Sequence, residues 1–407
     1  MSEPYQPPSG FLFAGISAGI KKKGGKDLGL ILAENDCSAA GVFTTSLLQA
    51  APVLISRQRI KSGKARAILV NSGNANCGLG QDGIIGAKET SRGLADHLDI
   101  KDSSILLAST GVIGEPFPSR KIIRAIPELV SKAGRNRGRD FMRAIMTTDT
   151  REKIAAASLT IKGKEVRLMG FAKGAGMIQP KMATMLAFVL TDAQVKPVHL
   201  QRVLKESMEG SFNRVTIDGD TSTNDTLFAL ASGAGGVEAE PNKPGWKRFT
   251  DAFRRVCLEL AGKIAADGEG ASRWFYVKVE GARTGADAEK IARRIANSPL
   301  VKTAVSAADP NWGRIVAAAG ISGARFDIKK SSLYLIGAKD GKRLEIFRHG
   351  ARSRTYRGRE SERKASEILK QSGFTILFKA GNAAAGFQII SCDFTEAYVR
   401  INAEYRS

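Results

Sequence analysis

Apolar and polar positions along this chain follow two different periods, which predicts a mixture of strands and helices. Residues 185–190 are apolar at every position, as in a strand that is covered on both faces. From Phe253 to Ile264 apolar residues recur every three or four positions, which is the spacing of one helix face. Thr250-Asp251 stands just before this run and is expected to cap the helix at its N-terminus.

The remaining elements follow from the same two patterns. Strands are expected at 65–70, 104–108, 274–279 and 398–405, and helices at 84–98 and 286–297. The strand at 104–108 is expected to end in a turn at 109–111 that exposes backbone amides. A stretch rich in Gly and Pro, 233–245, is the expected linker between two lobes. The mixture predicts an α/β or α+β fold.

Length and composition indicate a globular protein with a sizeable core. The chain has 407 residues, of which 43% are hydrophobic, so one large domain or two closely joined domains are expected. No apolar run approaches the roughly 18 to 20 residues that span a membrane. The first residues carry no targeting pattern and the four cysteines are scattered, which favours reduced thiols and a cytoplasmic location.

Charge and histidine content narrow the classes of function. The formal net charge of +22 would attract nucleic acid or an anionic membrane nonspecifically. Basic residues concentrate at 132–143 and 342–364, but acidic residues are interspersed there and aromatic residues do not alternate with the basic ones. We therefore expect a solvated basic face and no specific nucleic-acid or membrane partner. The three histidines lie far apart, so neither a metal site nor a His-based triad is expected.

The strongest candidate for a catalytic segment is a glycine-containing loop that carries Lys173 and leads into Ala183-Thr184. A threonine hydroxyl is a poor nucleophile unless a base removes its proton, and one economical base is the α-amine of the same residue. That amine titrates near 7.7 to 8.0, so part of it is unprotonated at neutral pH. The pattern therefore predicts an enzyme that cuts itself between Ala183 and Thr184 and carries an acyl group on Thr184. Taken alone, the stretch also fits an ordinary loop before a buried strand.

Four other motifs give weaker signals. The GxGxxG pattern at 78–83 lacks the strand and acidic residue that a dinucleotide site needs, and the GxSxG pattern at 15–19 is expected to be a local turn. Residues 218–225 lack the glycine and glutamate of an EF-hand loop and indicate an Asx-rich turn. Arg314 is a candidate either for clamping a substrate carboxylate or for holding Asp309.

The segment KGAGMIQPKMATMLAF resembles the self-cleavage segment of the ornithine acetyltransferase family, the glutamate N-acetyltransferases of arginine biosynthesis. Further blocks similar to that family occur in its order along the chain at 40–45, 50–53, 71–76, 109–114, 146–150, 218–225, 267–271, 309–314 and 400–407. The resemblance implies a layered αββα-type sandwich of sheets flanked by helices, with an N-terminal threonine as nucleophile. It also implies two fragments, 1–183 (α) and 184–407 (β), assembled as a heterotetramer of two α and two β chains.

The resemblance implies an activity and a set of site residues. The acetyl group of N-acetylornithine would pass to glutamate through acetyl-Thr184, with ping-pong kinetics and no cofactor; acetyl-CoA stays open as a further acetyl donor. The side chain of Thr110 and the backbone amide of Gly111 would form the oxyanion hole. The substrate-binding positions implied by the family are Thr147, Lys173, Thr184, Glu269, Asn402 and Ser407.

Two other readings compete with this interpretation. An N-terminal-nucleophile amidohydrolase or aminopeptidase would use the same chemistry with water as acceptor, and would release free acetate in place of N-acetylglutamate. A basic nucleic-acid-binding protein on an inactive scaffold would bind duplexes with a steep salt dependence that Thr184→Ala leaves unchanged.

Overall fold

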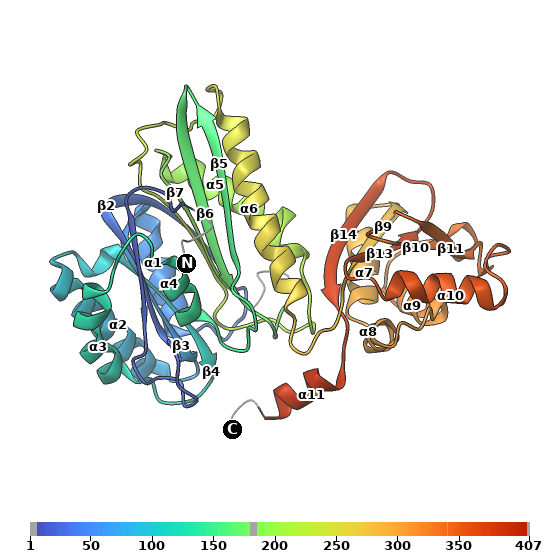
Figure 1. The fold of residues 1–407 in the computed structure, drawn as a ribbon, viewed down its shortest axis with the longest axis horizontal. Coiled ribbons are helices and arrows are strands. Elements are labelled where there is room, and N and C mark those ends of the chain that lie inside the picture. The colour runs from blue at the N-terminus through green and yellow to red at the C-terminus, as the bar shows by residue number, and fades with distance from the viewer. Residues whose placement is uncertain (1–5, 180–184, 340, 405–407) are drawn as a thin grey trace. The chain divides into compact units, whose positions relative to one another are not determined.

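The computed structural model describes residues 6–179, 185–339 and 341–404, and the chain forms two compact units. The first unit comprises Met1–Asn213 and Asp220–Ile264, and the second comprises Arg214–Gly219 and Ala265–Ser407. Each unit is built on one β-sheet with helices packed against it (Figure 1). The prediction of a mixed α/β fold with sheets flanked by helices is therefore confirmed.

The sheet of the first unit has the strand order β4-β3-β2-β8-β7-β6-β5, with β1 paired to β2. Strands β3 and β4 are parallel, as are β7 and β8, and the other neighbours are antiparallel. Every residue of β7 is buried, which confirms the strand expected from the apolar run at 185–190. The strands span β1 Phe11–Ile16, β2 Leu28–Phe43, β3 Lys64–Asn74, β4 Ile105–Val112, β5 Ile154–Ile161, β6 Lys164–Lys173, β7 Leu186–Thr191 and β8 Thr226–Ala231.

Helices cover both faces of this sheet because alternate strand residues are apolar on opposite sides. In β3, Leu69 packs in the cluster that includes residues of α1, α2 and α3, whereas Ile68 and Val70 pack in the cluster that includes α4. In α4, Phe141 contacts Phe171 and Phe188 in edge-to-face geometry. Such aromatic pairs add stability beyond that gained from the buried area alone. The helices are α1 Ala51–Arg59, α2 Gly80–Leu98, α3 Ser119–Ser131, α4 Gly138–Ile145, α5 Pro197–Gly210 and α6 Trp246–Ala266.

The sheet of the second unit has the order β12-β11-β10-β13-β9-β14, in which β9 and β13 are parallel. Helix α7 packs on β9 and β14, and its apolar face enters the core of this unit. The elements are β9 Trp274–Ala282, α7 Gly285–Ala296, α8 Pro299–Ser306, α9 Trp312–Gly320, β10 Ser332–Ile336, β11 Arg343–Arg348, β12 Ala351–Arg352, α10 Gly358–Leu369, β13 Phe374–Lys379, β14 Ala385–Cys392 and α11 Glu396–Ala403. Short 3-10 turns occur at Ile60–Ser62, Asp102–Ser104, Phe212–Arg214 and Ile328–Lys330.

The strands expected at 65–70 and 274–279 and the helices expected at 84–98 and 286–297 are confirmed by β3, β9, α2 and α7. The expected cap at Thr250-Asp251 is wrong, because α6 already begins at Trp246 and the Thr250 hydroxyl donates to the Lys247 carbonyl within the helix. The expected lobe linker at 233–245 is also wrong. That stretch lies inside the first unit, where the amide of Gln194 donates to the carbonyl of buried Val237.

The strand expected at 398–405 is wrong as well, because the chain forms helix α11 there. Contacts one turn apart favour the helix: Phe394 stacks on Tyr398 with 4.6 Å between ring centroids, and the Asn402 side-chain amide donates to the Tyr398 carbonyl. None of the described residues of α11 is buried. The alternation of apolar and polar residues here therefore has no core to face, and it does not hold the segment in a strand. Among the described residues, no helix combines the length and the apolar character needed to cross a bilayer.

We predict that Gly15→Ala destabilises the first unit because β1 approaches the backbone of α4 directly. A Cβ at Gly15 would lie 1.9 Å from the Asp140 carbonyl oxygen, so strand or helix must shift. The free energy of unfolding, measured by urea titration, should fall by about 2–3 kcal/mol. Gly262→Ala in α6 is the control: its Cβ meets nothing within 4 Å, and it should stabilise by about 0.5–1 kcal/mol. Equal changes in both variants would contradict the close approach.

Candidate active site

Polar residues gather where strands β6, β7 and β8 meet at one edge of the first sheet. Lys173, the last residue of β6, pairs with Leu186, the first residue of β7, and Leu186 pairs with Thr226, the first residue of β8. The next row across these strands therefore brings Gly174, Met185 and Asp225 to the same edge. This edge adjoins both ends of the loop that carries the predicted cleavage site.

Lys173 reaches from this edge to the predicted oxyanion donor. Its Nζ donates to the Thr110 hydroxyl oxygen at 3.1 Å, and both side chains are more than nine-tenths buried. Four strands separate β4 from β6 in the sheet order, which in a flat sheet would place them roughly 24 Å apart. The sheet therefore curves back on itself, and α4, which contacts β1, β2, β3 and β6, lies inside the curve.

Thr110 and Gly111 lie in a strand and not in a turn, so the turn expected at 109–111 is wrong. Strand β4 continues to Val112, and the pairing with β3 is irregular where Asn74 opposes both Thr110 and Val112. Gly111 has a φ of 135°, and a Cβ there would lie 2.3 Å from the backbone of Gly73. Only glycine fits this position, so the irregularity places the Gly111 backbone where any side chain is excluded.

Asp149 ties the predicted binding residue Thr147 to the loop after β6. Its carboxylate accepts the Lys153 ammonium at 2.6 Å, the Gly174 amide at 2.7 Å and the Thr147 amide at 3.0 Å. Burial alone would raise the pKa of Asp149, but the charges of Lys173 and Lys153 and these hydrogen bonds outweigh it and lower the pKa to about 2. Asp149 is therefore ionised at neutral pH.

The cluster around Asp149 suits an anionic ligand. Two buried ammonium groups, those of Lys153 and Lys173, face the Asp149 carboxylate in the part of the chain that the structure describes. Lys21 lies close enough that Lys173 affects it: burial lowers the pKa of Lys21, nearby Asp27 opposes this, and the charge of Lys173 lowers the pKa further. An excess of positive charge in a site of low polarity attracts a carboxylate strongly.

The pKa of Asp225, in contrast, is shifted upward. Burial is the main cause that raises its pKa well above the usual value, although hydrogen bonds from the Met185 and Ser222 amides and the charge of Lys173 act in the opposite direction. Sequence reasoning missed the roles of Asp149 and Asp225. Both occur in blocks noted only for their resemblance, and no pattern in the sequence shows which carboxylates become buried.

In the second unit, two of the predicted binding residues lie together. The Asn402 side-chain amide donates to the Glu269 carboxylate at 2.8 Å. The Thr395 hydroxyl donates to the carbonyl of Gly270, and Gly270, with a φ of 66°, packs so closely on the start of α11 that a Cβ would lie 2.5 Å from the Tyr398 nitrogen. The loop that carries Glu269 is thereby fixed to the helix that carries Asn402. Ala183, Thr184 and Ser407 lie outside the described residues.

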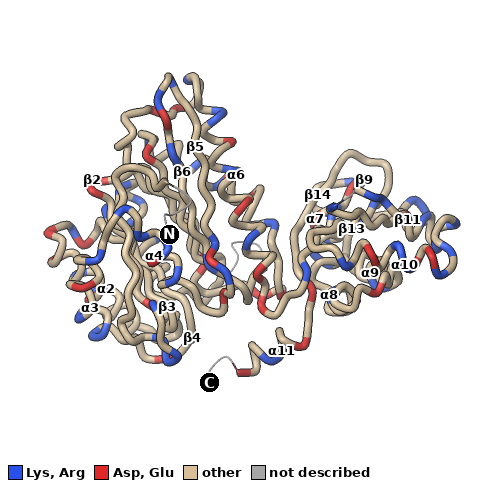
Figure 2. Tube along the Cα trace, viewed as in Figure 1, with Lys and Arg blue, Asp and Glu red and all other residues tan. Residues whose placement is uncertain are grey.

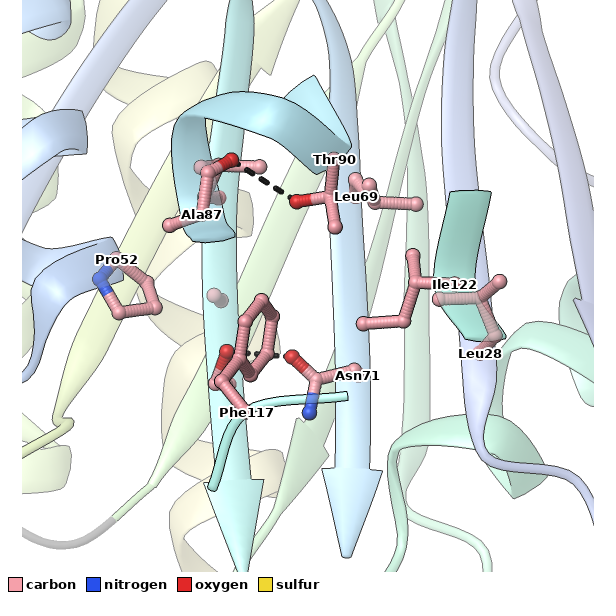
Figure 3. Close-up of a pocket in the computed structure, with 11 residues that line it drawn as sticks. Leu28, Pro52, Leu69, Asn71, Ala87, Thr90, Phe117 and Ile122 are labelled. Atoms are coloured by element: carbon pink, nitrogen blue, oxygen red, sulfur yellow. Dashed lines mark hydrogen bonds between the residues drawn. The ribbon is translucent and has the colours of Figure 1, made fainter. Parts of the chain in front are cut away.

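Other candidate features have structural roles. Arg314 does not hold Asp309: its guanidinium donates to the Leu300 carbonyl and the Thr303 hydroxyl, while Asp309 accepts from Asn311. Within the described ranges, no group of His, Cys, Asp and Glu could hold a metal ion. A small cavity behind Ser109 and Asn71, between β3, β4 and the helices over them, is lined mostly by apolar side chains and by no ionisable group (Figure 3). It is a gap in packing and not a site for charged substrates.

The high net charge is distributed over the surface. Figure 2 shows Lys and Arg along both units, interspersed with Asp and Glu. Exposed pairs such as Lys132 with Glu128 and Arg363 with Glu367 are separated by one helical turn. This arrangement supports a solvated basic face.

We predict that Asp149→Asn lowers the free energy of unfolding by about 3–5 kcal/mol, because buried Lys153 and Lys173 lose the carboxylate that compensates their charge. Urea unfolding at pH 7 measures the change. Glu128→Gln is the matched control: Glu128 also pairs with a lysine four residues away, but that pair is exposed, so stability should hardly change. A small effect of Asp149→Asn would show that its charge is not needed.

Comparison with known proteins gives a consistent result. The ArgJ family model matches residues 12–407. The arginine biosynthesis bifunctional protein ArgJ of Dehalococcoides mccartyi is 45% identical over 405 residues, covering 98% of this chain and 96% of that protein. The protein of the same name from Desulfotalea psychrophila is 44% identical over 401 residues, covering 98% of this chain and 99% of that protein.

Solved structures of similar proteins cover less of the chain. The crystal structure of arginine biosynthesis bifunctional protein argJ from Bacillus halodurans has a TM-score of 0.48 and 36% identity, and covers 53% of this chain and 97% of that chain. The crystal structure of ornithine acetyltransferase from Mycobacterium tuberculosis, complexed with ornithine, has a TM-score of 0.39 and 33% identity. It covers 43% of this chain and 94% of that chain. The family suggested by the motifs is confirmed by the match to the family model and by the curated relatives: the chain belongs to the ArgJ family.

Proposed function

We propose that this protein transfers the acetyl group of N-acetylornithine to glutamate in arginine biosynthesis, through an acetyl ester on Thr184. The observation that carries the proposal is the buried contact between Lys173 and Thr110 beside Asp149, at the edge where β6 ends and β7 begins. The contact brings a hydroxyl group and a positive charge to the sheet edge from which the loop that contains Thr184 leaves and to which it returns. Membership of the ArgJ family supports the same activity.

Self-cleavage between Ala183 and Thr184 would prepare the nucleophile. The Thr184 hydroxyl attacks the Ala183 carbonyl, and the peptide C–N bond breaks, which frees the Thr184 amine and leaves Ala183 as an ester on the Thr184 oxygen. Water then hydrolyses this ester, which releases the Ala183 carboxylate and restores the Thr184 hydroxyl. The described part of the loop supports a constrained backbone: Gly174 has a φ of 146°, and Met177, which is not glycine, has a φ of 56°. For a residue with a side chain, such as Met177, this conformation costs of order 1–3 kcal/mol and persists only where surrounding contacts hold it. Asp149 fixes the amide of Gly174 at the start of the same loop.

The freed amine would then act as the base in two acetyl transfers. It accepts the hydroxyl proton as Thr184 attacks the acetyl carbonyl, and ornithine leaves with the proton. The amine of glutamate attacks the ester in the second step, giving N-acetylglutamate. Thr110 suits an oxyanion donor because its oxygen accepts from Lys173, so its own O–H hydrogen is free to point at a developing negative charge. The Gly111 amide is the second proposed donor.

The substrates would be held by charge. Lys173 is the proposed partner of a substrate carboxylate and Thr147 lies beside Asp149 in the same cluster. Glu269, oriented by Asn402, is suited to an ammonium group, and Ser407 is proposed to donate a neutral hydrogen bond.

The proposed assembly is two α and two β fragments in the cytoplasm, working without a cofactor. The similar proteins are named bifunctional, which favours acetyl-CoA as a further acetyl donor.

Purified protein should consist of two fragments, 1–183 and 184–407, and Thr184→Ala should stay whole because no hydroxyl is present to attack the peptide bond. Intact mass spectrometry and N-terminal sequencing test both results. Incubation with N-acetylornithine alone should add one acetyl group to the second fragment, and glutamate should then remove it as N-acetylglutamate. An unbroken, fully active chain contradicts the proposal, and release of free acetate in place of N-acetylglutamate favours the amidohydrolase.

Thr110→Ala should lower kcat by roughly 10²–10³-fold with a smaller change in KM, because one oxyanion donor is lost in the transition state. The measurement uses initial rates of the isolated cleaved fraction, so that slow maturation does not affect the result. Thr110→Ser keeps the hydroxyl and should lose far less. If serine and alanine are equally impaired, the methyl group and not the hydroxyl matters, and the proposed role of Thr110 is wrong.

A further inference from the structure

Asn224 and Asp225, which directly precede β8, connect the two halves of the proposed site. Both side chains are more than nine-tenths buried. They belong to the 218–225 motif, which the sequence analysis described as an Asx-rich turn and as one of the blocks similar to the family. The proposed mechanism assigns no role to either residue.

Asp225 fixes the residue that follows the proposed nucleophile. Its Oδ1 accepts the Met185 amide at 2.9 Å, and the Met185 carbonyl accepts the Thr226 amide at 3.0 Å. Met185 is therefore held from both sides, and it is joined to Thr184 by one peptide bond. The Oδ2 atom of Asp225 is buried and has no hydrogen-bond partner among the described residues. A buried polar atom without a partner is costly, so this atom is available to a further polar group.

Asn224 fixes the residue that precedes the proposed oxyanion donors. Its side-chain amide donates to the Ala75 carbonyl at 2.7 Å and to the Ser109 carbonyl at 2.8 Å. Both partners are carbonyl oxygens, so the orientation of the amide is settled by chemistry. The peptide that links Ser109 to Thr110 is thereby held by the residue next to Asp225.

We propose that Asn224 and Asp225 are positioning residues that set the distance between Thr184 and its oxyanion donors. Their Cα atoms are about 3.8 Å apart, as in any trans peptide. The residue after the nucleophile and the residue before the oxyanion donors are therefore held by adjacent residues of one short, buried piece of backbone. An error of about 1 Å in such a distance can lower the rate by about 10²-fold. The proposal rests on the proposed function of Thr184.

Burial and charge define how Asp225 performs this role. Burial raises the pKa of Asp225 well above its usual value, so the carboxyl is shifted toward its uncharged form. An uncharged carboxyl and a carboxamide have the same shape, each with one acceptor and one donor group. Asparagine should therefore replace Asp225 far better than alanine, which lacks both groups.

The test compares Asp225→Ala, Asp225→Asn and Asn224→Asp in the full chain. Maturation is followed by intact mass, kcat and KM are measured on the cleaved fraction, and thermal melting verifies folding. We expect Asp225→Ala to mature slowly, with kcat about 100-fold lower and KM changed by less than about threefold. Asp225→Asn should recover to within about tenfold of wild type. Asn224→Asp loses both donors at constant volume, so its kcat should fall about as far as that of Asp225→Ala.

Wild-type maturation and kcat in a folded Asp225→Ala protein would overturn the proposal, and so would an Asp225→Asn protein as impaired as the alanine variant. If Asp225→Ala does not fold, a folded Asn224→Asp protein with wild-type rates overturns it. The outcomes also separate this inference from the proposed function. A wild-type chain that stays uncut, or that never carries acetyl on Thr184, refutes the function. If the wild type is cleaved and active, and the variants mature and react at the same rates, only the positioning role is refuted.

Discussion

The buried carboxylate of Asp149 is the interaction on which the arrangement of the first unit depends. It compensates the charges of Lys153 and Lys173, and it also fixes the amides of Thr147 and Gly174. Without it, Lys173 could not remain buried against Thr110 at low cost. One anion therefore holds together the end of β6 and a hydroxyl from β4, although four other strands lie between these two in the sheet order.

A second constraint comes from the order of strands. β7 and β8 lie between β2 and β6, so the middle of the sheet is built from chain that follows the proposed cut, and its two sides from chain that precedes it. The strand edge where these parts meet also carries Lys173, Met185 and Asp225. The same hydrogen-bonded rows that stabilise the sheet therefore fix Lys173, Leu186 and Thr226 in register at this edge.

The sequence alone predicts the parts of this structure in which local pattern and tertiary environment agree. β7 was predictable because a strand buried on both faces is apolar at every position, and α7 because its apolar residues share one face. Helix α11 was not, since its eight residues bury nothing and their alternation has no core to enforce it. Motif resemblance singled out Thr110, Lys173, Glu269 and Asn402 as candidates. It could not show that Lys173 contacts Thr110, because that contact depends on the curvature of the whole sheet, nor that Asp149 and Asp225 are buried with opposite charge preferences.

The position of β7 and β8 in the middle of the sheet affects whether the protein can refold after it has been cleaved. Before the proposed cut, unfolding and refolding concern one molecule, and the covalent chain keeps both parts at a high effective concentration. Afterwards the two pieces diffuse apart whenever the sheet opens, and recovery becomes a bimolecular encounter between exposed edges that also favour aggregation. Folding must therefore be finished before scission, and the mature protein survives through the slowness of its opening.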